Sequence, residues 1–491
     1  MEKLINELRL VVQKRHSRNY IYKQVACIWN FQIIIREIKP NLINMRLYST
    51  NLQAEEVSFE TALIAGLAPD KGLYMPKTLP GFSEEELLSL KDEPYPEIAF
   101  QILKKILKDE IDEESLKEIT YDAYNYDVPL EKVDDITYIM RLDRGPTASF
   151  KDFAARMMAR LMQYYLKKEE RQLTILTATS GDTGSAVAHA FYGLDNIRVI
   201  VLFPQDEVSD RQRKQMTTLG ENITALSIDG KFDDCQAMVK QAFADEELSH
   251  LNLSSANSIN IGRLVPQSIY YFYAYLKLRD YPEELIVSIP SGNFGNMMGC
   301  VLAKTMGVPI KKILASVNEN DEVPTFLDCG KYAKIVPSKN CLSNAMNVGH
   351  PSNLSRLIAI YGGEMDEKGN VNRMPDMEGL RQDISSTSVT DKETKAIMKE
   401  FFDDYNILIE PHGAVGIKGL RDYRELTKDN TLAVTLETAH PAKFPEEVSS
   451  VVGVDPELPE SLQKIESGEE HMESLTTDYA SFKEYLKMKL E

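Results

Sequence analysis

Short apolar segments alternate with amphipathic segments through most of the chain. Runs such as "QLTILTATS" (172–180), "NIRVIVLFP" (196–204) and "ELIVSIPSG" (284–292) are apolar, β-branched and too short for typical helices. Each run is followed by apolar residues at helical spacing, as in "NMMGCVLAKTMG" (296–307). This alternation predicts an α/β protein with parallel strands and with helices on both faces of the sheet. Because ligands bind at the carboxyl ends of such strands, the loops that follow them are the candidate site.

The region before these strands has a different pattern. "SEEELLSL" (83–90) and "PEIAFQILKKIL" (96–107) have the apolar spacing of helices. "APDKGLYMPKTLP" (68–80) is interrupted by Pro and Gly and predicts a loop. A small N-terminal domain is therefore expected to precede the α/β region.

Composition narrows the functional class. The chain has 491 residues, of which 43% are hydrophobic and 27% charged, as expected for a folded globular protein. Its formal net charge of −19 disfavours nucleic acid and anionic membranes as main partners. The five cysteines form no CxxC pair and no His/Cys cluster, which predicts reduced thiols in a cytoplasm and no metal site. No apolar run reaches 18 residues.

Residues 1–44 differ from the remainder. They contain eight basic and three acidic residues and the only tryptophan, Trp29, within "VACIWNFQIII" (25–35). A signal peptide or a transit peptide is disfavoured, because the apolar run lacks a cleavage site and the segment is poor in serine. The favoured interpretation is a start-site artefact, with translation beginning at Met45. A regulatory extension is the alternative.

The segment "GPTASFKDF" (145–153) places Lys151 where a helix is predicted to begin. Ser149 and Asp152 match the S-x-x-D pattern of a capping box. Burial and the positive end of a helix both disfavour an ammonium charge, so a neutral, nucleophilic Lys151 that forms a Schiff base is one interpretation. A surface lysine beside a capping box is the other. One helical face of this segment is apolar and comprises Phe150, Phe153, Ala154, Met157, Met158, Leu161, Met162 and Tyr165.

Two further loops follow predicted strands. In "IPSGNFGNMMG" (289–299), small residues allow close approach of the backbone to a ligand, and the next helix supplies N–H groups for an anion. The segment lacks both the Walker lysine and the GxGxxG spacing. In "TATSGDTGSAVAHAF" (177–191), Ser180 and Thr183 are candidates for binding a carboxylate, while Asp182 is expected to face a protonated group or backbone donors. The alternatives without a ligand are a tight left-handed turn before a helix for the first loop and a capped βα turn for the second.

Several motifs in one order resemble the threonine synthase family, which uses pyridoxal phosphate (PLP) and has fold type II. They are "YSTN" (48–51), "GLAPDKGLYMP" (66–76), "GPTASFKDF", "TATSGDTG", "SANSINIGR" (255–263), "PSGNFGN" and "ETAHPAKF" (437–444). The resemblance runs from about Met45 to just after Phe444 and implies parallel sheets flanked by helices in two lobes, with PLP in the cleft. It divides the chain into a non-family extension (1–44), a threonine synthase-type N-terminal domain (45–130), a PLP-binding catalytic region (131–460) and a helical tail (461–491).

The resemblance also implies residue roles. Lys151 is implied to hold PLP and to act as the base that moves protons, and Thr438 is implied to hydrogen-bond the pyridine nitrogen. The loop around the PLP phosphate is implied to comprise Gly292, Asn293, Phe294, Gly295 and Asn296. Family members often carry Asp at the position of Asn296. The implied substrate contacts are Ser180, Asp182, Thr183, Asn257, Asn260 and, for the substrate's phosphate, Lys443.

The implied reaction converts O-phospho-L-homoserine and water to L-threonine and phosphate, a β,γ-replacement that ends threonine biosynthesis. A hydroxyl at Thr438 holds a pyridinium less firmly than a carboxylate would, which favours a cofactor tuned for proton shuttling over maximal electron withdrawal. His412 is interpreted as structural. The expected enzyme is cytoplasmic, acts on a small molecule as a monomer or homodimer, and has no nucleic-acid or membrane partner. The alternatives are a dehydratase, a β-replacing synthase, a phospho-lyase that releases a keto acid, and a PLP-free protein that binds another phosphate.

Overall fold

The computed structural model describes residues 45–491 apart from 109, 180, 279–282 and 491. The expectations for residues 1–44 therefore lie outside the described residues. Residues 45–491 form one compact unit. Within this described part, no helix has both the length and the apolar character that a bilayer-spanning segment needs.

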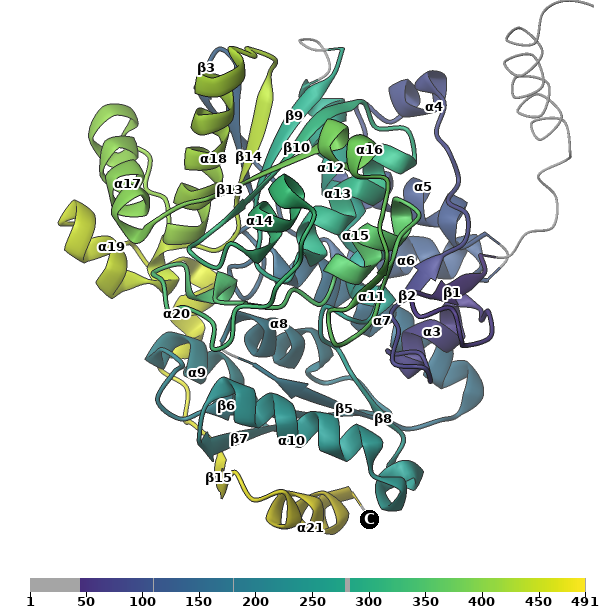
Figure 1. The fold of residues 1–491 in the computed structure, drawn as a ribbon. Helices are drawn as coiled ribbons and strands as arrows, with labels where there is room; N and C mark the ends of the chain where they lie inside the picture. Colours follow the sequence, from purple (N-terminus) through teal and green to yellow (C-terminus); the bar gives the residue numbers. More distant parts are fainter. Residues whose placement is uncertain (1–44, 109, 180, 279–282, 491) are drawn as a thin grey trace, which may run out of the picture. The chain divides into compact units, whose positions relative to one another are not determined.

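The first elements of this unit are a two-stranded sheet and four helices (Figure 1). Strands β1 (Leu47–Ser49) and β2 (Tyr74–Pro76) pair in antiparallel register. The helices are α3 (Phe59–Ala65), α4 (Glu84–Ser89), α5 (Tyr95–Ile106) and α6 (Glu113–Ala123). Helix α4 begins at a capping box in which Ser83 and Glu86 satisfy each other's backbone N–H groups. The two helices predicted from the apolar spacing, α4 and α5, are confirmed.

The larger sheet has six strands. In spatial order these are β13 (Ile384–Ser388), β10 (Ile310–Val317), β9 (Leu285–Pro290), β14 (Ala433–Glu437), β4 (Thr137–Arg141) and β3 (Leu130–Asp134). All neighbours are parallel except β3 and β4, which form an antiparallel pair at one edge. The four inner strands, β10, β9, β14 and β4, are largely buried because helices cover both faces, as the sequence pattern predicted, whereas the edge strands β13 and β3 are more polar and partly exposed.

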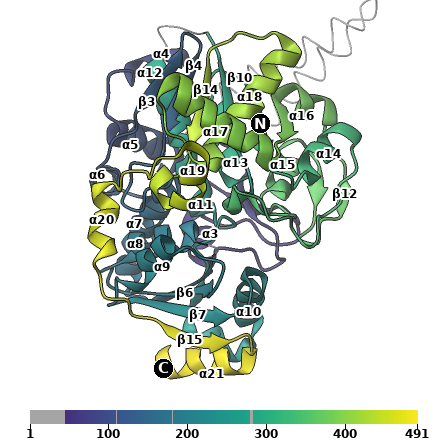
Figure 2. The ribbon, with the colours of Figure 1, turned by 90° about the vertical axis from the view of Figure 1, so that its left-hand side faces the viewer.

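The second sheet has five parallel strands. In spatial order they are β15 (Glu473–Thr476), β7 (Ile223–Asp229), β6 (Ile197–Pro204), β5 (Leu173–Ala178) and β8 (Leu253–Ser254). Figure 2 shows β15 beside β7 at the lower edge. The tail predicted as helical thus also contributes a strand. Its sequence, "ESLT", is short and polar, so no apolar alternation indicated it.

The remaining regular segments connect these strands. The α-helices are α7 (Lys151–Glu169), α8 (Asp182–Phe191), α9 (Asp210–Thr217), α10 (Phe232–Ala244), α11 (Ile261–Leu264), α12 (Ile269–Leu278), α13 (Gly295–Thr305), α14 (Glu322–Cys329), α15 (Leu354–Ile360), α16 (Met377–Asp383), α17 (Asp391–Tyr405), α18 (Pro411–Thr427), α19 (Pro445–Val452), α20 (Glu460–Glu466) and α21 (Tyr479–Leu490). Shorter pieces are the 3₁₀ turns η1 (Glu246–Leu251), η2 (Val265–Ser268), η3 (Asn344–Met346) and η4 (Pro441–Lys443) and the hairpin β11 (Glu364–Met365) and β12 (Val371–Arg373).

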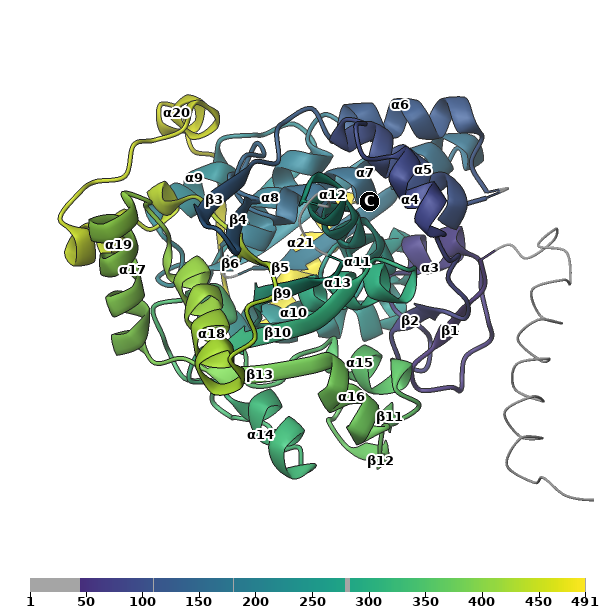
Figure 3. The ribbon, with the colours of Figure 1, turned by 90° about the horizontal axis from the view of Figure 1, so that it is seen from above.

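Alternating side chains of each strand pack into different cores. In the five-stranded sheet, Leu176 and Leu202 pack with α10 and α21, while Ile175 and Val201 face the large central core. In the six-stranded sheet, Ile286 and Leu314 pack with α18 on one face, and α13 lies on the opposite face (Figure 3). With both sheet faces covered, the loops after β5, β9 and β14 are left to carry chemistry.

Candidate active site

Lys151 is the first residue of α7, as predicted, but the predicted capping box is wrong. The residue at the N-cap position is Phe150, and no side chain caps the helix there. The Ser149 hydroxyl is buried without a hydrogen-bond partner among the described residues. The Asp152 carboxylate instead accepts bonds from the backbone N–H and the hydroxyl of Thr147, at 2.8 and 2.6 Å. The S-x-x-D pattern fails because the helix begins one residue later than the pattern requires.

The lysine loop is pinned to the loop that follows β14. The backbone N–H of Phe150 donates to the carbonyl of Thr438 at 2.8 Å, and the N–H of His440 donates to the carbonyl of Ala148 at 2.9 Å. These two hydrogen bonds, on either side of a bridge between Ser149 and Ala439, fix the relative position of the two segments. Lys151 and Thr438, which are far apart in sequence, are therefore held in neighbouring backbone segments.

The amino group of Lys151 lies in a mostly buried, mixed-charge environment. Its side chain is 15% exposed, and Nζ lies 4.0 Å from Asp182 Oδ2 and 4.7 Å from the centre of the Phe150 ring. Burial lowers the pKa of Lys151 to about 8, because it disfavours the charged form. The Asp182 carboxylate opposes this shift, whereas the positive charges of Lys443 and Arg263 add to it. A pKa of about 8 leaves roughly a tenth of the amine neutral at pH 7, far more than for an ordinary lysine.

Arg263 belongs to the quoted "SANSINIGR" motif but was not predicted as a site residue. It is buried, its Nη1 donates to the carbonyl of Ala256 at 2.7 Å, and its Nε has no partner among the described residues. Burial lowers the pKa of Arg263 to about 10. Its effect on Lys151 depends on spatial proximity, which the sequence does not encode.

Asp182 and Lys443 form a buried ion pair. Lys443 Nζ lies 2.7 Å from Asp182 Oδ1 and donates to the carbonyl of Thr147 at 2.9 Å, and Gln212 Nε2 donates to Asp182 Oδ1 at 3.0 Å. Burial alone would raise the pKa of Asp182, but Lys443 and Lys151 outweigh it and hold this pKa well below its usual range. The expectation that Asp182 faces a protonated group agrees with this geometry.

The loop after β9 is shaped for close approach to an anion. Phe294 has φ of +60°, a conformation that costs energy for a residue with a side chain, and it immediately precedes α13. A Cβ on Gly292 would lie 2.9 Å from backbone atoms of Ala345 and Met346, so only glycine fits there. The carbonyl of Asn293 is held by Asn353, whose Nδ2 donates to it at 3.0 Å. The first N–H groups of α13 lack intrahelical partners, as at any helix start.

Asn296 supplies a free donor at the start of α13. Its Oδ1 accepts hydrogen bonds from the hydroxyls of Tyr270 and Tyr271, each at 2.5 Å. Its Nδ2 is buried and bonds to no group that the structure describes. A buried donor without a partner costs free energy unless a ligand supplies the acceptor. Together with Gly292 and the helix start, this donor fits a phosphate group.

The other residues predicted to bind substrate lie in different settings. Asn257 is half-buried, and its Oδ1 accepts from the Thr177 hydroxyl at 2.6 Å. Thr183 is half-buried in the first turn of α8. Ser180 lies outside the described residues.

Asn260 is fully buried and caps α11. Its Oδ1 accepts from Gly262 N–H at 2.8 Å, and its Nδ2 donates to the carbonyls of Ser255 and Leu63 at 3.0 and 2.9 Å. The amide oxygen and the amide nitrogen of Asn260 are thus both engaged in holding the loop together. Its role toward a substrate stays a prediction.

Sequence reasoning missed the groups behind Thr438. The Thr438 hydroxyl donates to Glu410 Oε1 at 3.3 Å, and Glu410 also contacts His412. These groups lie in the segment "EPHG" (410–413), in which Glu410 is the N-cap of α18. An acidic residue before Pro at a helix start is already explained as a cap, so the sequence gives no reason to assign it a second role.

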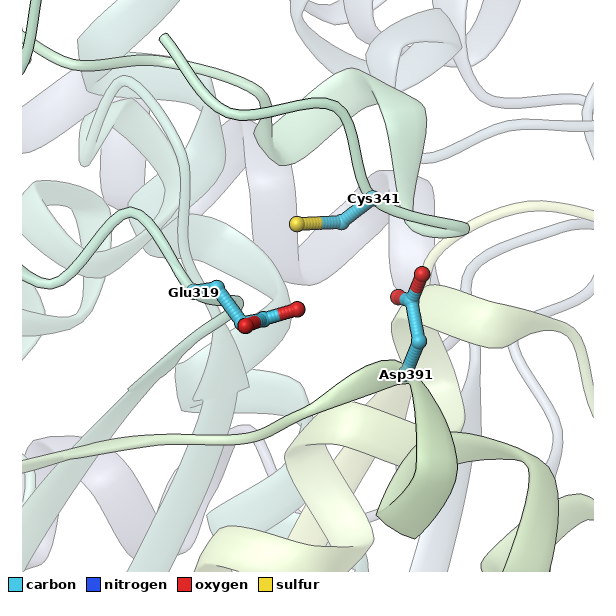
Figure 4. A group of neighbouring side chains, drawn as sticks. All are labelled: Glu319, Cys341 and Asp391. Atoms are coloured by element: carbon cyan, nitrogen blue, oxygen red, sulfur yellow. The ribbon is translucent and has the colours of Figure 1, made fainter.

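A separate cluster brings together Glu319, Cys341 and Asp391, whose potential ligand atoms lie within 4.8 Å of one another (Figure 4). Asp391 Oδ1 already accepts a hydrogen bond from Leu342 N–H at 2.9 Å. Burial raises the pKa of the Cys341 thiol, which disfavours the thiolate that binds metals. The cluster therefore provides no argument for a metal role.

Three family models and several known proteins match this chain over most of its length. A family model described as "Pyridoxal-phosphate dependent enzyme" matches residues 124–437, "Threonine synthase N terminus" matches 46–124, and "Threonine synthase, C-terminal" matches 413–486. Threonine synthase of Serratia marcescens is 40% identical over 85% of this chain and 93% of its own length. Threonine synthase of Escherichia coli is 40% identical over 85% of this chain and 94% of its own length.

Solved structures of threonine synthases have the same fold as this chain. The structure of PLP-bound threonine synthase from Brucella melitensis matches with a TM-score of 0.85 and 35% identity, covering 90% of this chain and 99% of that one. Yeast threonine synthase matches with a TM-score of 0.83 and 29% identity, covering 91% of this chain and 99% of that one. The chain therefore belongs to the threonine synthase family of pyridoxal-phosphate-dependent enzymes.

Proposed function

We propose that this chain binds PLP and converts O-phospho-L-homoserine and water to L-threonine and phosphate. The observation that carries the proposal is Lys151, a mostly buried amine with a pKa lowered to about 8, pinned beside the Thr438 loop. The relatives that share 40% identity over most of both chains are threonine synthases, which supports the same activity here.

The residues present fit PLP. Lys151 would hold the cofactor, and Gly292–Gly295 with the Asn296 Nδ2 donor would hold its phosphate. The Thr438 hydroxyl would face the ring nitrogen. When bound, PLP supplies an electron sink for the negative charge that remains when a proton leaves the carbon beside the substrate amine.

The chain's own groups would move protons and orient the substrate. The neutral form of Lys151 Nζ would take the proton from the α-carbon and return one later; its lowered pKa supports a role as a base. Thr183 and Ser180 would bind the substrate carboxylate, and Asn257 and Asn260 would line the pocket.

Lys443 would contact the phosphate of the substrate. An ammonium group has three N–H donors, and its contacts with Asp182 and the Thr147 carbonyl use two. The third donor is available to a phosphate oxygen. The Asp182 carboxylate would then keep Lys443 oriented while the phosphate departs.

The proposal extends to the setting of the enzyme. It would act in the cytoplasm on this small molecule, as a monomer or homodimer, without a nucleic-acid or membrane partner. The formal net charge of −19 supports the last two points.

The test of the reaction is a joint assay of products. Holoenzyme with O-phospho-L-homoserine is expected to form threonine and phosphate one for one. Phosphate with a keto acid and ammonia in place of threonine would make the chain a phospho-lyase. A protein that takes up no PLP would contradict the proposal as a whole.

The lowered pKa of Lys151 predicts how cofactor capture depends on pH. The rate at which the apo-protein captures added PLP is expected to rise with pH, with its midpoint at about pH 8, and to level off at higher pH, because the neutral amine is the reactive form. In Lys443→Met the midpoint is expected at higher pH, since a neighbouring positive charge is lost and Asp182 is freed to stabilise the charged form of Lys151. Stopped-flow absorbance measures both. A wild-type rate that keeps rising toward pH 10.5, the value of an ordinary lysine, would contradict the prediction.

A further inference from the structure

A carboxylate lies directly behind the hydroxyl that is expected to face the cofactor ring. Glu410 is fully buried, and its Oε1 accepts from the Thr438 hydroxyl at 3.3 Å. Thr438 is itself 6% exposed. The backbone of Thr438 is held from the other side by the N–H of Phe150, which donates to its carbonyl.

The other contacts of Glu410 all donate to it. Oε1 also accepts from the N–H of Gly413 at 3.0 Å, and Oε2 accepts from the N–H of His412 at 2.6 Å and contacts His412 Nδ1. The ring of His412 has a defined tautomer, because its Nε2 accepts from the N–H of Ala345 at 3.1 Å. The proton of the neutral ring is therefore on Nδ1 and points at Glu410. A carboxyl surrounded by four donors has no acceptor for a proton of its own, which favours the ionised form.

The neighbouring carboxyl of Glu437 supports this assignment of charge. Its Oε1 accepts from the backbone N–H of Glu410 at 2.8 Å. Burial, with the charge of Glu410, raises the pKa of Glu437 well above its usual range. Glu437 accepts this one hydrogen bond, and its Oε2 has no partner among the described residues, whereas the Glu410 carboxyl accepts from four donors; of the two buried carboxyls, Glu410 is therefore the better placed to carry the charge.

A hydroxyl has one proton to donate and two lone pairs with which to accept. Because the Thr438 proton points at Glu410, the hydroxyl presents only lone pairs elsewhere. We propose that Glu410 is a positioning residue that fixes the Thr438 hydroxyl as an acceptor toward the cofactor's ring nitrogen, so that this nitrogen is bound in its protonated form. The inference rests on the proposed function, in which Thr438 faces that nitrogen.

Binding of a protonated ring nitrogen is the opposite of the expectation from the sequence that Thr438 favours proton shuttling over maximal electron withdrawal. A threonine alone is free to donate to a neutral ring nitrogen, which favours a weakly electron-withdrawing cofactor. A threonine held by a carboxylate binds a protonated ring, which withdraws electrons more strongly. Glu410 thus stabilises the protonated ring nitrogen as a directly bonded carboxylate would, but it acts through the Thr438 hydroxyl.

The test is nitrogen NMR of holoenzyme reconstituted with PLP that is isotopically labelled at the ring nitrogen. The wild type is expected to show the chemical shift of a pyridinium, and Glu410→Gln that of a neutral pyridine. The glutamine amide would satisfy more donors by placing its oxygen toward His412, which offers two, and its NH₂ toward Thr438. The hydroxyl would then accept from the glutamine and turn its proton toward the ring.

Two further variants keep the result interpretable. Glu437→Gln is the matched control: it changes a buried carboxyl in the same cluster that is already neutral, so the pyridinium shift and the activity are expected to stay. Thr438→Val removes the hydroxyl without touching Glu410, and a neutral ring is expected there even if Glu410→Gln fails to fold. A neutral ring nitrogen in the wild type, or a pyridinium in both Glu410→Gln and Thr438→Val, would overturn the inference and leave the proposed function intact. A wild type that binds no PLP would overturn both.

Discussion

Replacement of Lys151 by alanine is expected to abolish turnover and to remove the visible absorbance of lysine-bound PLP. Lys151 is proposed both to anchor the cofactor and to act as the base, and loss of a general base alone lowers rates by about a hundredfold to ten-thousandfold. Losing the anchor adds to this effect, so kcat is expected to fall by about ten-thousandfold or more. Phosphate release and the absorbance spectrum measure the two roles separately.

Lys167→Ala provides the matched control. It removes a lysine from the last turn of the same helix, but this side chain is 55% exposed and 4.0 Å from an exposed carboxylate, Asp195. Both the absorbance and the activity are expected to persist. A Lys151→Ala protein that keeps the visible band and forms threonine would contradict the assignment.

The second large effect concerns the buried pair of Lys443 and Asp182. Lys443→Met is expected to lower the free energy of unfolding by about 3–5 kcal/mol, because it leaves the Asp182 carboxylate buried without its closest positive partner. The carbonyl of Thr147 also loses its donor. Urea denaturation of the apo-protein at neutral pH measures the change without interference from bound cofactor.

Two further variants separate the contribution of the buried Lys443–Asp182 pair from the effect of losing a lysine. The double variant Lys443→Met with Asp182→Asn is expected to recover part of the loss, because the uncompensated charge is then gone. Lys399→Met breaks the exposed pair with Asp403, where the side chains are 55% and 47% exposed, and is expected to cost less than about 1 kcal/mol. Equal costs for the Lys443 and Lys399 variants would show that burial of the Lys443 pair has no energetic weight.

The sheet architecture could be predicted because most of its strands are recognisable as short apolar runs in the sequence. Runs such as Leu173–Ala178 and Leu285–Pro290 are apolar on both faces, since helices cover both sides, and strict βα alternation leaves parallel sheets as the simplest arrangement. Strand Glu473–Thr476 was missed because it joins the edge of a sheet through backbone bonds, to which its polar side chains give no clue.

The site could be predicted only where a residue's role is local in sequence. Lys151 at a helix start and the Gly292–Gly295 turn before α13 are visible in short segments. The tyrosines that orient Asn296 and the arginine near Lys151 come from elsewhere in the chain and meet the site only in the folded state.

At Ser149 a local sequence pattern led to a wrong prediction. A capping pattern was present, but the helix begins one residue later, and the serine hydroxyl is buried without a partner among the described residues. Local patterns compete with tertiary pairing, and here the bonds between the Ala148–Phe150 and Thr438–His440 segments fix the backbone.

The most direct test of the central claim locates the cofactor on the chain. Borohydride reduction of the holoenzyme would fix the PLP group to its lysine irreversibly, and trypsin would no longer cleave after that residue. The account predicts the added mass on one peptide, residues 145–156, which spans Lys151 and ends at Arg156. Added mass on a different lysine, such as Lys443, or no added mass in a protein that shows the visible band, would contradict it.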